Sequence, residues 1–350
     1  MRKTLIIFAL AAAVSCIKDN PFVDNSMDGE ILFDIPVTSN MMKSVAGPVQ
    51  GSYPEDETMG VFAYHSELDS GQPWTSDITA TSYFEDMEFE HRSDLNAWAG
   101  VTPCYWPSSG SLIFAGFSPY SQTGGNHIQN VSFDVNQKTL LINGYEVETY
   151  VPMTEAQMYD ISSSYTNKCQ SDLMYFLPKS DVNNDFLGST RGASYAADFY
   201  HALAQVVFNV EADTQNDIDY IRLRKIVLTD MASKGDFSAK IGRTQAGEVA
   251  WALSNGGTSE DITVLDNPST NGGLELSTQQ RKVVELLTIP VGEHDILVTY
   301  TLNVNGTLYE ETINYHAEWE AGKKYVYNLI LGTNNIQLVP QITTDWIKHE

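Results

Sequence analysis

Cationic residues are scarce in this sequence. Its 350 residues contain 20 lysines and arginines against 45 aspartates and glutamates, which gives a formal net charge of −25 at pH 7. Because such a chain repels phosphate groups, nucleic acids and anionic lipid surfaces are poor partners for it. The charges are scattered, so the sequence has no disordered acidic tail. Long apolar runs are also missing, and no window approaches the roughly 20 residues of a transmembrane helix.

Motifs of catalysis and metal binding are absent as well. The sequence contains no G-x-S-x-G, no H-E-x-x-H, no phosphate-cradling glycine loop and no calcium-loop spacing. No two histidines lie four residues apart, and we interpret His201 as a hydrogen-bonded structural residue rather than a general base. The sequence therefore predicts a protein that is not an enzyme and that holds no metal and no cofactor.

One acidic stretch resembles the paired carboxylates of glycosidases. Its four carboxylates alternate with Met87 and Phe89, a pattern typical of an edge strand with one solvated face. We favour this interpretation over a catalytic role for Glu85, Asp86, Glu88 and Glu90.

Only three cysteines are present, and the first follows a short export signal. Arg2 and Lys3 precede an apolar stretch over residues 5–13, and small residues lead to Cys16. A cysteine at this point resembles a lipobox, which implies an acyl chain on Cys16 and removal of residues 1–15. Cys104 and Cys169 then remain, either paired in a disulfide or as two thiols.

The pattern of the remaining chain is β almost throughout. Short runs rich in Val, Ile, Tyr, Phe and Thr are separated by Gly, Asn, Asp and Pro clusters, as in antiparallel sandwiches. Asn305-Gly306 between two such runs predicts a tight hairpin. A polar stretch over 178–192 is the best linker, so we expect two β-sandwich domains, 16–184 and 185–350. The predicted strands cover residues 30–35, 59–64, 111–117, 172–177, 201–210, 221–228, 295–302, 324–331 and 336–339.

Aromatic residues are dense in the first half of the chain. In a sandwich they are expected to fill the core, whereas an exposed shelf of rings would bind glycans. Trp74 and Trp98, which stand in loop-like surroundings, are the candidates for exposure. The rings in question are Trp74, Trp98, Tyr105, Trp106, Phe117 and Tyr120.

Several segments, taken in order, resemble fimbrillin-like proteins. The run from Cys104 through Pro107 to residues 111–119 is similar to a motif of their first domain, and residues 200–208 to the strand that opens the second. Residues 319–329 resemble the hairpin before the final strand, and Asp345-Trp346 matches the common ending.

The resemblance implies two transthyretin-like β-sandwich domains and a role in type V pili of Gram-negative anaerobes. Members are acylated, carried to the outer membrane and cut after their first strand. The strand that leaves is replaced by a strand of another pilus subunit through β-augmentation. The protein is then expected at the cell surface, in a stalk, tip or anchor position, with host or bacterial surfaces as possible adhesive targets.

Specific residues follow from this resemblance. The removable first strand is 30–35, with Ile31, Phe33 and Ile35 on its buried face. The donor strand is 335–346, with plugs at Ile336, Leu338 and Ile342.

The processing point departs from the family pattern. Lys43 stands where stalk subunits carry an arginine, and the next arginine is Arg92. Either a protease that accepts Lys43 is used, or the first strand stays and the subunit remains an anchor. The alternative function is a monomeric glycan-binding surface lipoprotein.

Overall fold

The computed structural model describes residues 29–35, 53–75, 79–122, 125–159, 169–192, 194–213, 218–267, 272–332 and 337–343. Across these ranges the chain forms strands β1 to β23 and one short helix, α1 (Glu155–Tyr159). The all-β fold predicted from the sequence is thereby confirmed. Among the same residues, no helix has the length and apolar character needed to traverse a lipid bilayer.

The first half of the chain is built on an eight-stranded sheet. Its outermost strands, β11 and β12, are separated in the chain by residues 197–199 alone, so the two edges of the sheet are brought together and the sheet rolls up. One apolar core lies inside the roll, with side chains from seven of the strands. The strand order is β11 (Tyr195–Ala196), β1 (Leu32–Asp34), β5 (Ala97–Gly100), β4 (Thr81–Arg92), β2 (Met59–Ser66), β6 (Ser111–Ser118), β9 (Met174–Phe176) and β12 (Tyr200–His201).

Strands β2 and β6 are apolar on both faces because both faces of the sheet are covered. All eight residues of β6 are buried. Gly116 in this strand is a site of close approach, because a Cβ there would overlap the Phe176 ring. Glycine is therefore required at this position for the aromatic ring to lie flat on the strand.

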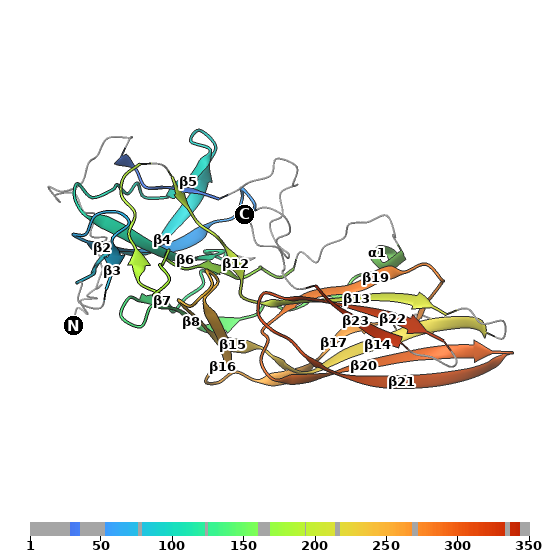
Figure 1. Ribbon diagram of the computed structural model, residues 1–350. Helices are drawn as coiled ribbons and strands as arrows, with labels where there is room; N and C mark the ends of the chain where they lie inside the picture. Colours follow the sequence, from blue (N-terminus) through green and yellow to red (C-terminus); the bar gives the residue numbers. More distant parts are fainter. Residues whose placement is uncertain are drawn as a thin grey trace, which may run out of the picture.

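A four-stranded sheet joins the two halves of the chain. It combines the hairpin β7 (Val131–Asp134) and β8 (Thr139–Glu146) with the hairpin β15 (Lys234–Lys240) and β16 (Glu248–Leu253). Strands β8 and β15 pair antiparallel, and this sheet packs on the outer face of the rolled sheet. In Figure 1 it lies between the rolled sheet and the long strands of the second half.

The stretch 178–192, expected to be a linker, contributes a strand to the first half. β10 (Phe186–Leu187) pairs with β3 (Pro73–Trp74), and β11 and β12 extend the rolled sheet as far as His201. Strands of only two residues leave no alternating pattern in the sequence, which is why a polar linker was expected near residue 185.

The second half of the chain forms a sandwich of two sheets. One sheet has the order β19 (Arg281–Thr288), β13 (Ala204–Ala212), β22 (Lys324–Leu331) and β23 (Gln337–Thr343). The other has the order β17 (Ser259–Asp266), β14 (Ile218–Ala232), β20 (Glu293–Val304) and β21 (Thr307–Glu318), with β18 (Leu274–Glu275) paired to β14.

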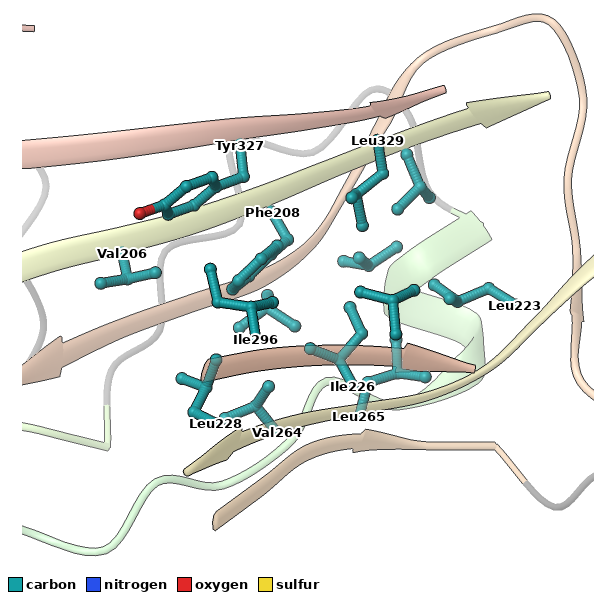
Figure 2. Packing of buried hydrophobic residues seen from close by; sticks show 14 of the residues in the cluster. Val206, Phe208, Leu223, Ile226, Leu228, Val264, Leu265, Ile296, Tyr327 and Leu329 are labelled. Carbon is teal, nitrogen blue, oxygen red and sulfur yellow. The ribbon is translucent and has the colours of Figure 1, made fainter. Parts of the chain in front are cut away.

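The core of this sandwich lies between its two sheets. Figure 2 shows Val206, Phe208 and Leu329 of one sheet facing Leu228 and Ile296 of the other. The hairpin predicted at 305–306 connects β20 to β21, and both of its residues have the positive φ that this turn requires.

Candidate strand-exchange site

Strand β1 lies inside the rolled sheet, with a neighbour on each side. It pairs antiparallel with β5, where Phe33 is opposite Trp98, and parallel with β11, where Phe33 is opposite Tyr195. The pairing begins before the strand itself, because the N–H of Ile31 donates to the Cys104 carbonyl at 2.9 Å. The first strand predicted from the sequence is therefore an interior strand, and its departure would leave a gap between β5 and β11.

The side chains of the segment alternate as the sequence predicted. Ile31, Phe33 and Ile35 are buried in the core of the roll, while Leu32 is half-buried and Asp34 is exposed. Burying a large apolar side chain stabilises a fold by about 1.5–3 kcal/mol. The three inward residues thus make this short segment a major part of the core.

Phe33 is surrounded by four aromatic rings from four different strands. The distances between ring centroids are 5.0 Å to Phe89, 5.2 Å to Phe114, 5.4 Å to Tyr195 and 5.9 Å to Phe176. The first three rings stand edge-on to Phe33, the arrangement in which ring electrostatics are favourable. One side chain of β1 therefore holds β4, β6, β9 and β11 around a common centre.

A buried carboxylate lies at the start of the same segment. Glu30 is a buried residue, and its Oε1 lies 3.5 Å from Nη1 of Arg92, the last residue of β4. Arg92 also donates to Asp94 at 2.9 Å. Glu30 and Arg92 therefore form an ion pair between the start of the first segment and the end of β4.

Cys104 and Cys169 are both thiols in the structure. Cys104 lies against the first segment, where burial and then the charge of Glu30 raise the pKa of its thiol to about 12. The sulfur of Cys169 accepts a hydrogen bond from the Val151 N–H at 3.2 Å. Of the two alternatives that the sequence left open, the structure has two thiols and no disulfide between Cys104 and Cys169.

The predicted donor segment includes β23, an edge strand of its sheet. Among the described residues its one neighbour in that sheet is β22, with Leu338 opposite Leu329 and Ile342 opposite Tyr325. The strand also contains Pro340, which has no N–H to donate. Ile336 lies outside the described residues, as do Cys16 and Lys43.

The two candidate exposed tryptophans are buried, so that expectation was wrong. Trp98 is 1% exposed and Trp74 is 3% exposed. The indole N–H of Trp98 donates to the Glu57 carbonyl at 3.3 Å, which places a residue with loop-like neighbours inside the first core. Within the described ranges the exposed large apolar residues include no tryptophan: they are Val101, Val151, Val182, Leu253, Leu308 and Tyr309.

The acidic stretch lies in β4, which pairs with β5 on one side and β2 on the other, so the expectation of an edge strand was wrong. Phe89 points into the core, as predicted, and Asp86 lies 3.0 Å from Nε2 of His127. The other ring nitrogen of His127 donates to the Tyr120 carbonyl at 2.9 Å, so both nitrogens are engaged. His201 is also structural, since its Nδ1 lies 2.9 Å from Asp172 in the buried interior.

Glu57, near the first core, has a raised side-chain pKa. Burial, reinforced by the nearby carboxylates of Asp56, Asp172 and Glu148, raises the pKa of Glu57 from 4.5 to about 8. The folded protein therefore binds a proton at Glu57 under conditions where the unfolded chain has released it.

These observations define a multi-sheet β protein whose first strand completes a closed core. A family profile of fimbrillin-like proteins matches residues 49–346, and the chain belongs to this family. The family consists of structural proteins of pili and adhesion, so the chain is not an enzyme. No curated protein matches the sequence.

Solved structures of similar chains come from Bacteroides and Parabacteroides species. A proposed cell adhesion protein from Bacteroides uniformis is 12% identical with a TM-score of 0.44, and the match covers 91% of this chain and 100% of that one. A second, from Bacteroides ovatus, is 14% identical with a TM-score of 0.41, covering 91% and 97%. A fimbrial assembly protein from Parabacteroides distasonis is 12% identical with a TM-score of 0.39, covering 86% and 96%.

Replacing Phe33 tests the importance of the ring cluster. We expect Phe33→Ala to lower the free energy of unfolding by about 3–5 kcal/mol, because it leaves a cavity among four rings. Asp34→Ala, on the exposed side of the same strand, should change it by less than about 0.5 kcal/mol. Urea unfolding followed by tryptophan fluorescence reports on this core through Trp98 and Trp106. Equal effects of the two substitutions would contradict the assignment.

Replacing Glu57 tests its ionisation. Because the folded pKa is raised, the contribution of Glu57 to stability is complete below pH 4.5 and is lost as the pH rises towards 8. We expect Glu57→Gln to gain stability relative to the natural protein across this window, by at most about 1.4 kcal/mol per pH unit. The exposed Glu55→Gln is the control. Parallel stability curves for Glu57→Gln and the natural protein would refute the raised pKa.

Proposed function

We propose that this protein is a structural subunit of a type V pilus or related surface adhesin, assembled by donor-strand exchange. The observation that carries the proposal is the position of β1, an interior strand with Phe33 at the centre of the first core. A strand that is covalently joined to the rest through a single connection can be cut free. The gap that it leaves has the two unpaired edges and the apolar floor that β-augmentation requires.

The cut would fall in the connection between β1 and the residues before β2. Ile35 is the last described residue of the first segment, and the description resumes at Tyr53. Lys43 lies between them and is the proposed processing point. Cleavage there separates Ile31, Phe33 and Ile35 from the remainder of the chain, so only non-covalent contacts then hold β1.

The donor in the proposed exchange is the C-terminal segment 335–346. Its described part, β23, is paired on one side only, so its departure breaks one ladder where the departure of β1 breaks two. Ile336, Leu338 and Ile342 alternate along this segment and supply the side chains that would enter the gap of a neighbouring subunit.

We propose further that Cys16 carries the acyl chain that brings the precursor to the outer membrane. If Lys43 is not cut, the subunit keeps β1 and its lipid and serves as an anchor. If it is cut, the subunit joins the fibre, and its outer surface faces host or bacterial ligands. The alternative, a monomeric glycan-binding lipoprotein, depended on exposed tryptophan rings, and Trp74 and Trp98 are buried.

Strand exchange can be measured on the folded full-length protein. A lysine-specific protease is applied, and a fluorescent peptide of residues 29–36 is added in excess. We expect the peptide to enter the cleaved protein, as detected by anisotropy and by a labelled band on a gel. Lys43→Gln, which keeps the connection intact, should bind no peptide.

Entry of the peptide into Lys43→Gln, or its failure to enter the protein cut at Lys43, would contradict the exchange. Mass spectrometry of the new N-terminus at Ser44 confirms that the intended bond was cut. Intact secondary structure by circular dichroism excludes unfolding as the cause of a failure.

The lipid anchor has its own test. We expect Cys16→Ala to abolish retention of the protein in the membrane fraction, because the acyl chain has no other attachment point at the signal. Cys104→Ala, which alters a buried thiol, should leave retention unchanged. Fractionation with immunoblotting gives the readout, and a Cys16→Ala protein that still sediments with membranes would remove the lipoprotein assignment.

A further inference from the structure

We propose that the gap left by β1 takes a strand from a different subunit. That strand carries an aromatic residue, an aliphatic residue two positions before it and two positions after it, and a carboxylate three positions before it. This chain's own C-terminal strand does not fit that gap. The inference rests on the proposed strand exchange and specifies its partner. It follows from the shape of the gap, from its charge and from a comparison of two segments of this sequence.

The shape of the gap is set by the ring cluster. Phe33 is fully buried, and the four rings around it stand on β4, β6, β9 and β11, strands that all remain after β1 has left. Their centroids lie 5.0–5.9 Å from that of Phe33. An aliphatic side chain in this place would leave part of the space between the rings empty, which is costly in a close-packed core.

The charge of the gap is set by Arg92. Loss of Glu30 removes the buried carboxylate that lies 3.5 Å from its guanidinium. The side chain of Arg92 is 31% exposed, and Asp94, which is 64% exposed, is the acidic neighbour that stays. A carboxylate on the incoming strand, three residues before its aromatic residue, restores the lost pair.

Two Ile positions complete the pattern. Ile31 and Ile35 flank Phe33 on the inward face, and both are buried in the same core. The strand that fits the gap therefore reads acid, aliphatic, any residue, aromatic, any residue, aliphatic, as in residues 30–35 themselves.

The C-terminal segment does not carry this pattern in either direction. Residues 336–344 include no aromatic residue and no acid. Placing Ile342 at the aromatic position, with the segment reversed so that Asp345 meets Arg92, puts Pro340 in the place of Ile35. Proline lacks the N–H that the ladder needs at an interior position.

Trp346 is the aromatic residue that remains in this segment, and it fits no better. With Trp346 at the aromatic position, Thr344 and Lys348 take the two aliphatic positions, whichever way the segment runs. Lys348 would place an ammonium group in the apolar floor of the gap, without a carboxylate three positions away on the required side. The chain's gap and its C-terminal strand are therefore not complementary, and the protein is a junction between unlike subunits rather than a self-repeating unit.

The experiment uses the full-length protein cut at Lys43 and four synthetic peptides. The first is residues 29–36, the second and third are the same peptide with Phe33→Ala and with Glu30→Gln, and the fourth is residues 335–346. Competition against the labelled first peptide gives relative affinities. We expect the Phe33→Ala peptide to bind at least about 100-fold more weakly. The Glu30→Gln peptide should bind about tenfold more weakly, and peptide 335–346 should fail to compete at a 100-fold excess.

Self-assembly gives the second readout. The cleaved protein alone should form no SDS-resistant ladder on a gel. A ladder, or competition by peptide 335–346 equal to that of the first peptide, would overturn the inference while supporting strand exchange itself. Absence of binding by the first peptide would overturn both, because the gap would then not open.

Discussion

The packing of Phe33 among four aromatic rings is the contact on which the first half of the molecule depends. Each ring belongs to a different strand, so the strands of the roll share one centre through a side chain that β1 supplies. The order of the sheet explains why this matters: β1 is the link between β5 and β11, and β11 leads within a few residues to β12 at the opposite edge. Without β1, β5 and β11 lose their shared neighbour, and the apolar core that Phe33 fills is opened to water.

The other two apolar clusters of the molecule contain no residue of β1. The core of the second half is a separate cluster between two sheets, and it shares no residue with the core of the roll. A third cluster lies between the rolled sheet and the four-stranded sheet, where β8 and β15 join the two halves by backbone hydrogen bonds. In the proposed exchange, the departure of β1 would remove side chains from only one of these three clusters.

Much of this could be read from the sequence because it depends on local patterns. Alternation over residues 30–35 predicts which face of the first strand is buried, and Asn305-Gly306 predicts a hairpin. The pairing of β1 with β11 could not be predicted, since Tyr195 is more than 150 residues away and its strand has two residues. The burial of Trp98 and the ion pair between Glu30 and Arg92 were missed for the same reason: long-range contacts leave no periodic signal.

The two ends of the chain differ in how much they lose by leaving their sheets. β1 has a strand on either side and an aromatic side chain in a closed cluster, whereas β23 has one neighbour and forms an edge. Edge strands are sites of pairing with other chains, and proteins protect them with charge, as β21 does with Glu310 and Glu311 on its exposed surface. In β23 the described sequence Gln337–Thr343 has no charged residue, so this edge lacks that protection. In the proposed exchange, a strand that gives up one ladder and enters an interior gap gains two ladders and a core position. The difference favours assembly, and it makes the fit of the incoming side chains to the Phe33 cluster the step that selects the partner.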